Sequence, residues 1–148
     1  MIARIGLIAA ATAFAPVLLA QNPDAEVRNY LRTAQSIMQM QQQPNVQLTL
    51  RPADDEIDAA VRQIDRAGVL TRTDLRVRPV IDINTPTLKR FSSMVDLLRA
   101  ARFQLLQEQR NEPGSEWRIA AIKHIDRALR EVHHAAIREF LDRQLNDY

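Results

Sequence analysis

The chain has no cysteine and only three glycines among its 148 residues. Without cysteine it forms no disulfide, thiolate zinc site, iron–sulfur cluster or c-type haem attachment. So few glycines disfavour turn-rich all-β folds and glycine-rich nucleotide-binding loops. Neither sign of charge dominates, because the chain has 20 lysines and arginines and 18 aspartates and glutamates, which gives a net charge of +2. This balance argues against a partner that is a nucleic acid, which a basic surface would recognise.

One long apolar run is present, at the start of the chain. Arg4 precedes the apolar stretch Ile5–Phe14, and Val17–Ala20 leads to a cleavage site expected before Gln21. A positive residue followed by an apolar stretch too short to span a bilayer comfortably is typical of a secretory signal peptide. We therefore predict a signal peptide over residues 1–20, a single domain over 21–148, and a periplasmic or secreted protein that contacts no membrane after cleavage. The alternative is an uncleaved N-terminal anchor.

Four segments show apolar residues at the spacing of an α-helix. The predicted caps at their N-terminal ends are Asn22, Asp54, Thr85 and Ser115, and Gly68 is the predicted C-terminal cap of the second. The resulting helices cover residues 23–43, 54–67, 86–110 and about 115–145.

Each predicted helix has one apolar stripe that a packed bundle would bury. In chain order the stripes are Val27, Leu31, Ala34 and Met38; Ile57, Ala60, Val61, Ile64 and Ala67; Phe91, Met94, Leu98, Ala101 and Leu105; and Ala121, Ile122, Ile125, Ala128, Leu129, Val132 and Ala136. Trp117, in the first turn of the fourth helix, is predicted to anchor the core.

These segments predict an all-α protein, a four-helix bundle made of two tandem αα-hairpins over residues 22–68 and 85–148. Residues 69–84 form the predicted linker, which is long enough to suggest that it packs on the bundle or carries a contact. Val46, Leu48 and Leu50 alternate with polar residues and predict a short extended segment before the second helix.

An internal repeat supports two stacked hairpins. Residues 59–67 read A-A-V-R-Q-I-D-R-A and residues 120–128 read A-A-I-K-H-I-D-R-A, at an offset of 61. A weaker repeat relates residues 31–34 to residues 98–101. Two copies of a hairpin that cannot bury its apolar face alone are expected to stack on each other.

The chain resembles a group of uncharacterised exported bacterial proteins built from tandem helical hairpins. The resemblance rests on the A-x-x-x-I-D-x-A stretches at Ala60–Ala67 and Ala121–Ala128, on L-L-R-A-A-R at Leu97–Arg102, and on Pro79-Val80 before Asp82. It covers roughly residues 28–138 and implies this fold and export, without a particular chemistry. There is a fainter similarity to a small periplasmic metal-binding helical protein, through A-I-K-H at Ala121–His124, although the repeated histidines of that protein are missing here.

The candidate metal ligands are His124, Glu131, His133 and His134. At 100° per residue the three histidines point to different sides of one helix, so they cannot converge on one ion from within it. A two-histidine chelate also needs a spacing of three or four residues. Exposed surface histidines are therefore the favoured interpretation, and weak divalent-metal binding is the alternative. A neighbouring copy of the chain could still bring His134 close to its counterpart.

The repeated aspartates, Asp65 and Asp126, are the candidate pair for acid–base catalysis. A structural role is favoured, since Asp126 can pair with Arg130 one turn later and Asp65 can act in the same way against the adjacent hairpin. No nucleophile, P-loop or dinucleotide motif accompanies them. We therefore predict a non-enzymatic binding or interaction module without cofactor, which contacts an unidentified protein partner through its last helix or its linker. It can form an oligomer, and a hydrolase is the remote alternative.

Overall fold

The computed structural model describes residues 22–40, 43–71, 87–107 and 112–146. Four helices make up nearly all of them: α1 (Pro23–Gln39), α2 (Pro44–Thr71), α3 (Thr87–Gln107) and α4 (Ser115–Asn146). The predicted all-α four-helix bundle is confirmed. The predicted signal peptide and the predicted helix start at Thr85-Pro86 lie outside the described residues. None of the described helices is long and apolar enough to cross a membrane.

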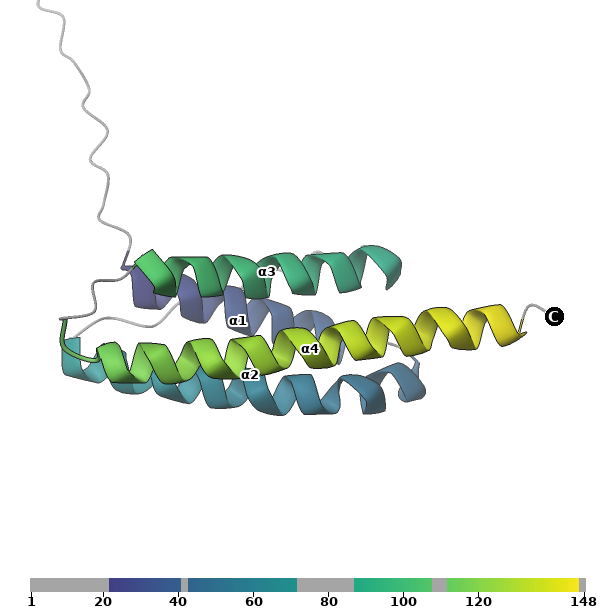
Figure 1. Ribbon diagram of the computed structural model, residues 1–148, viewed down its shortest axis with the longest axis horizontal. Helices are drawn as coiled ribbons and strands as arrows, with labels where there is room; N and C mark the ends of the chain where they lie inside the picture. The colour runs from purple at the N-terminus through teal and green to yellow at the C-terminus, as the bar shows by residue number, and fades with distance from the viewer. Residues whose placement is uncertain (1–21, 41–42, 72–86, 108–111, 147–148) are drawn as a thin grey trace, which may run out of the picture.

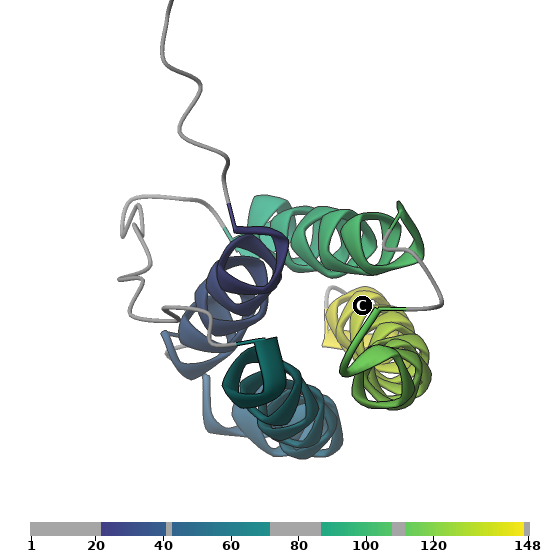
Figure 2. The same ribbon diagram turned by 90° about the vertical axis from the view of Figure 1, so that its left-hand side faces the viewer.

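The bundle consists of two hairpins stacked side by side. Helices α1 and α2 form one hairpin and α3 and α4 the other, with α1 packed on α3 and α2 packed on α4. The view along the bundle shows the order α1, α3, α4, α2 around its axis (Figure 2). Helix α2 ends where α1 begins, whereas α3 begins at the opposite end (Figure 1). Neighbouring helices are therefore antiparallel, in an up-down-down-up order that needs one long connection between the second and third helices.

The core lies along the centre of the bundle and is built from the predicted stripes. The predicted residues of α1 and α3 are all buried: Val27, Leu31, Ala34, Met38, Phe91, Met94, Leu98, Ala101 and Leu105. In α4, Ala121, Ile125, Ala128 and Val132 are buried, while Ile122, Leu129 and Ala136 are partly buried against them. Helical periodicity thus identified the face of each helix that packs inward.

The beginning of α2 differs from the prediction. An extended segment at Val46–Leu50 and a helix start near Asp54 are wrong, because α2 begins at Pro44 and continues through Pro52. Burial explains the difference: Val46 and Leu50 are four residues apart and both enter the core. Their packing offsets the lost hydrogen bond and the crowding that an interior proline imposes, which cost about 3 kcal/mol.

The end of α2 also differs from the prediction. Gly68 is not a C-terminal cap, since the helix continues to Thr71 and Gly68 is buried within it. The first three residues of the predicted 69–84 linker are therefore helical, and its residues 72–84 lie outside the described residues.

The internal repeat corresponds to the packed halves of α2 and α4. Two of the three alanines in each copy are buried, Ala60 and Ala67 on α2 and Ala121 and Ala128 on α4. Small side chains allow two helices to approach closely, and Gly114 completes this contact. Gly114 has φ +85°, and a Cβ atom placed on it would lie 3.1 Å from the Cα atom of Ala67. Only glycine adopts this conformation and this approach without strain.

Candidate functional site

The predicted metal ligands are distributed around α4. His124 is half-buried, and its Nδ1 atom lies 2.5 Å from Oε2 of Glu56 on α2. His133 and His134 are exposed, and Glu131 is partly buried. Within the described ranges, no three histidine, aspartate or glutamate side chains gather closely enough to hold a metal ion. One chain therefore does not assemble three of the predicted ligands around an ion, and metal binding stays a prediction.

The repeated aspartates hold each hairpin together. Asp65 accepts a hydrogen bond from Arg28 Nε on α1 at 2.8 Å, and Asp126 accepts one from Arg102 Nε on α3 at 2.7 Å. The expected partner of Asp126, Arg130 on the same helix, is replaced by this partner on the neighbouring helix. Each aspartate thus forms a partly exposed ion pair within its own hairpin.

A buried ion pair joins the diagonal helices α1 and α4. Arg118 donates from Nε to Asp24 Oδ1 at 2.9 Å and from Nη2 to Asp24 Oδ2 at 2.7 Å. Its Nη1 atom donates to the carbonyl of Pro113 at 3.1 Å. The side chains are only 6% and 2% exposed, respectively. Two parallel bonds between planar groups fix both distance and orientation, so this pair aligns the start of α1 with the start of α4.

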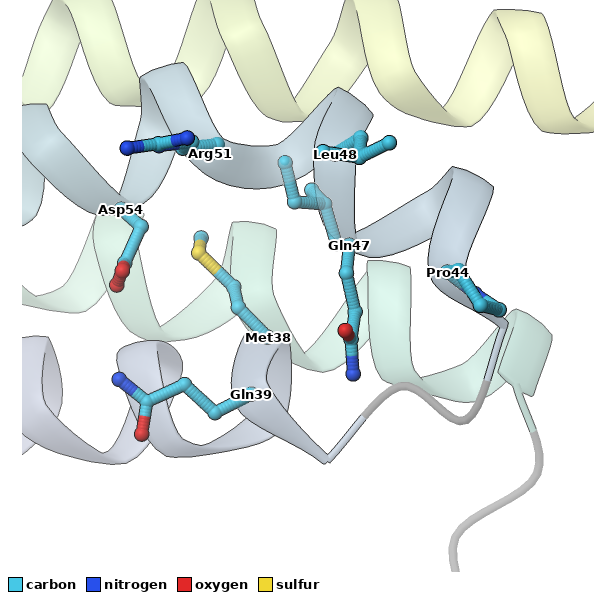
Figure 3. Close-up of a pocket in the computed structure, with 8 residues that line it drawn as sticks. Met38, Gln39, Pro44, Gln47, Leu48, Arg51 and Asp54 are labelled. Carbon is cyan, nitrogen blue, oxygen red and sulfur yellow. The ribbon is translucent and has the colours of Figure 1, made fainter.

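A pocket of about 520 Å³ opens between the end of α1 and the beginning of α2. Figure 3 shows the Asp54 carboxylate pointing from α2 toward the end of α1, where Met38 and Gln39 lie, while Arg51 runs along α2 at the upper edge of the view. Apolar and polar side chains share the lining: Met38, Gln39, Pro44, Gln47, Leu48, Leu50, Arg51 and Asp54.

Asp54 is the most unusual polar group of this pocket. Its Oδ1 atom is buried, and no donor among the described residues bonds to it. Burial raises the pKa of the Asp54 carboxyl, and the negative charges of Asp58 and Asp55 add to the shift, although Gln35 and Arg32 partly oppose it. The pocket therefore contains a carboxylate whose negative charge is incompletely compensated.

Asp58, one turn further along α2, has the opposite electrostatic environment. Burial alone would raise the pKa of Asp58, but hydrogen bonds from Gln35 and Arg32 outweigh it and leave that pKa below its ordinary value. Arg32 Nη1 lies 2.8 Å from Asp58 Oδ1 and 2.5 Å from Gln35 Oε1, and Gln35 Nε2 donates to Asp58 at 3.0 Å. Arg32 is thus bonded to Asp58 and not to Asp54.

The last third of α4 carries an exposed apolar face. Figure 1 shows the yellow end of α4 extending past the ends of the other three helices. Four large apolar residues are at least half exposed there: Ile137, Phe140, Leu141 and Leu145. Their spacing of three and four residues places them on one side of the helix, roughly opposite its buried stripe. We call these four residues the α4 apolar face.

Trp117 lies at the surface and is not the buried core anchor that the sequence predicted. It is half-buried, and the Arg66 guanidinium lies 5.1 Å from the centre of its ring, within cation–π range. Together with Val69 and Leu70 these two side chains border a hollow of about 480 Å³ at the end of α2.

Sequence reasoning missed the pocket because it placed the start of the second helix ten residues too late, at Asp54 rather than at Pro44. A helix that starts at Asp54 makes this residue an N-terminal cap, whereas in the structure its side chain lies between α1 and α2. The signal that would have found it is the spacing of Val46, Leu50, Ala53 and Ile57, which continues the core stripe upstream.

No family model, curated protein or solved structure matches this chain. The resemblance to exported helical-hairpin proteins therefore stays a prediction.

Proposed function

We propose that this protein is an exported, non-enzymatic helical interaction module, and that its α4 apolar face binds a second copy of the same chain. The observation that carries the proposal is the exposure of four large apolar side chains on a helix end that extends past its own bundle. Single exposed apolar residues are common on soluble proteins, but a continuous group of them marks an interaction surface.

The α4 apolar face is turned away from the core of its own bundle. The buried stripe of α4 runs through Val132 and Ala135, and its next positions are the polar residues Glu139 and Asp142. Glu139 and Asp142 border a narrow crevice against the first turn of α2. The segment is therefore amphipathic, with its polar side toward its own bundle and its apolar side toward solvent.

A second copy fits this surface because an antiparallel pair of α4 ends is self-complementary. If the two-fold axis passes beside Phe140, the Phe140 rings of the two copies meet and each Leu141 faces the apolar side of the other helix. Arg138, Glu139 and Asp142 all border the crevice against α2, so these charged side chains lie on the side of the segment that faces its own bundle. The contact between the two copies is therefore apolar.

The size of the contact predicts a weak dimer. Four half-exposed side chains on each copy, at roughly 100 Å² apiece, bury about 800 Å² in total, below the range of stable interfaces. The low net charge of +2 adds little long-range repulsion between copies. We expect a monomer–dimer equilibrium with a dissociation constant of tens of micromolar or weaker.

Sedimentation velocity of the purified protein, from about 1 µM to about 1 mM, tests this expectation. Phe140→Glu should weaken dimerisation at least about tenfold, because it places a charge in the centre of the contact. Phe103→Glu is the matched control, since Phe103 is 62% exposed on α3 and Phe140 is 58% exposed on α4.

Two results would overturn the proposal. One is a monomer at every concentration. The other is a dimer that Phe140→Glu and Phe103→Glu weaken equally, which would place the contact elsewhere.

A further inference from the structure

The pocket between α1 and α2 has the size and lining of a small-molecule site. Its volume of about 520 Å³ lies within the range of roughly 300–1,000 Å³ that such sites occupy. The apolar lining that is open to solvent comes from Pro44 and Leu48, whereas Met38 and Leu50 are almost fully buried beneath it.

The charges around the pocket select the sign of its ligand. Asp54 lines it, and Asp55 and Asp58 lie within one turn on the same helix. Arg32 on α1 is bonded to Asp58 and Gln35, and it acts on Asp54 only through its charge. That attraction and a hydrogen bond from Gln35 lower the pKa of Asp54, but burial outweighs them. Arg51 is the one cationic residue among the described residues that line the pocket. In Figure 3 it runs along α2, whereas the Asp54 carboxylate points toward α1. The local field at the Asp54 carboxylate therefore favours a positive group.

The Asp54 carboxylate supplies the acceptor for such a ligand. Its Oδ1 atom is closed to solvent, but the residue is only partly buried, so a ligand N–H would bond to the other carboxylate oxygen. An ammonium donor forms a charge-assisted hydrogen bond, which is stronger than the bond an alcohol or amide donates.

We propose that this pocket binds a small organic cation, in which an ammonium group donates to the Asp54 carboxylate and an apolar body packs on Pro44 and Leu48. The site is separate from the α4 apolar face, which lies on a different helix and takes a different partner. The ligand class is defined by two features together, a positive nitrogen and an apolar group of about six to eight heavy atoms, and a pocket of this size holds both.

Benzylammonium is the probe, and benzyl alcohol is its neutral counterpart of nearly the same shape. Titration of the purified protein with each, followed by NMR chemical shifts or calorimetry, should show the cation binding at least about tenfold more tightly, equivalent to about 1.4 kcal/mol. Asp54→Asn should abolish this preference. Asp55→Asn is the matched control: it removes the same charge from the neighbouring exposed position, which does not line the pocket, and should change the affinity less than threefold.

The pH dependence provides a second, variant-free test. Asp54 must be ionised to hold the cation, so affinity should fall as pH is lowered through its pKa, which burial raises above the ordinary value. The charged groups that act on this carboxyl are Asp55 and Asp58 on α2 and Arg32 on α1. Asp58 has a lowered pKa and titrates at lower pH than Asp54.

Three results would overturn the proposal: no binding of the cation, equal binding of benzyl alcohol, or equal losses of affinity in Asp54→Asn and Asp55→Asn. The comparison of the two probes on the unmodified protein decides the question even if a variant folds poorly. Benzylammonium should also bind normally to Phe140→Glu, because that change lies outside the pocket.

Discussion

Removal of one partner of the Asp24–Arg118 pair should destabilise the protein more than the loss of any surface ion pair. The two side chains are 2% and 6% exposed and share two hydrogen bonds of 2.7 and 2.9 Å. Asp24→Asn leaves the Arg118 guanidinium buried without a counter-charge, which is expected to cost about 3–5 kcal/mol. A domain of this size is stable by only about 5–15 kcal/mol, so the loss is a large fraction of the total.

Arg118→Met should cost less than Asp24→Asn. The carboxylate left behind lies in the first turn of α1, where the helix dipole and free N–H groups stabilise a negative charge by about 0.3–1 kcal/mol. The double variant Asp24→Leu with Arg118→Met removes both charges and leaves apolar side chains in their place. It should be far more stable than the sum of the single losses predicts, and close to the unmodified protein.

Urea unfolding followed by circular dichroism measures the unmodified protein, Arg118→Met, the double variant and Asp24→Leu, the single variant that closes the cycle; Asp24→Asn is measured beside them. Circular dichroism is preferable to fluorescence, because Trp117 is the neighbour of Arg118 and would report local changes. The reasoning would be refuted by single-variant losses below about 1 kcal/mol, the value for an exposed pair. The reasoning would also be refuted if the free-energy loss of the double variant equalled the sum of the two single losses, because the two side chains would then act independently.

Four further predictions concern other parts of the bundle. Gly114→Ala should destabilise by about 2–4 kcal/mol, from its φ of +85° and the crowding against Ala67; an unchanged melting temperature would contradict the close approach. Asp58→Asn should lower the free energy of unfolding at neutral pH and change it little at acid pH. The ionised Asp58 carboxylate stabilises the fold above about pH 3.8, and this contribution is lost as the pH falls through the lowered pKa of the folded protein. Asp54→Asn should show the opposite trend: its stability relative to the unmodified protein should increase as the pH rises through the raised pKa of Asp54. Measuring the free energy of unfolding of both variants across pH compares the two trends. Zinc should not strengthen the dimer, because the antiparallel register separates the His133 side chains of the two copies by roughly 21 Å along the helix axis; zinc-dependent dimerisation in sedimentation would indicate a parallel pair.

Much of the fold was predictable because each helix carries its own periodic signal. Every predicted stripe residue of α1 and α3 is buried, and α4 begins at the predicted Ser115 and ends within a residue of the predicted end. The failure at the start of α2 has a specific cause. Pro52 is a strong local signal against a helix, and only the burial of Val46 and Leu50 in the assembled core outweighs it.

The candidate sites were less predictable than the fold. The exposed residues of the α4 apolar face follow the same helical spacing as core residues, so the sequence alone does not show that they face solvent. Asp54 was read as a helix cap, and its unpaired oxygen follows from the positions of α1 and α2 relative to each other.

The sequence by itself determined that the protein is helical, that it has four helices in two related halves, and which face of most helices is apolar. These properties are local, because the spacing of side chains within one helix decides them. Only the tertiary structure decided which helices become neighbours. That choice pairs Asp24 with a residue 94 positions away and forms the pocket between α1 and α2. It also lets the end of α4 extend past the ends of the other described helices. No local pattern encodes these features, because each depends on the lengths and relative positions of helices that are far apart in the chain.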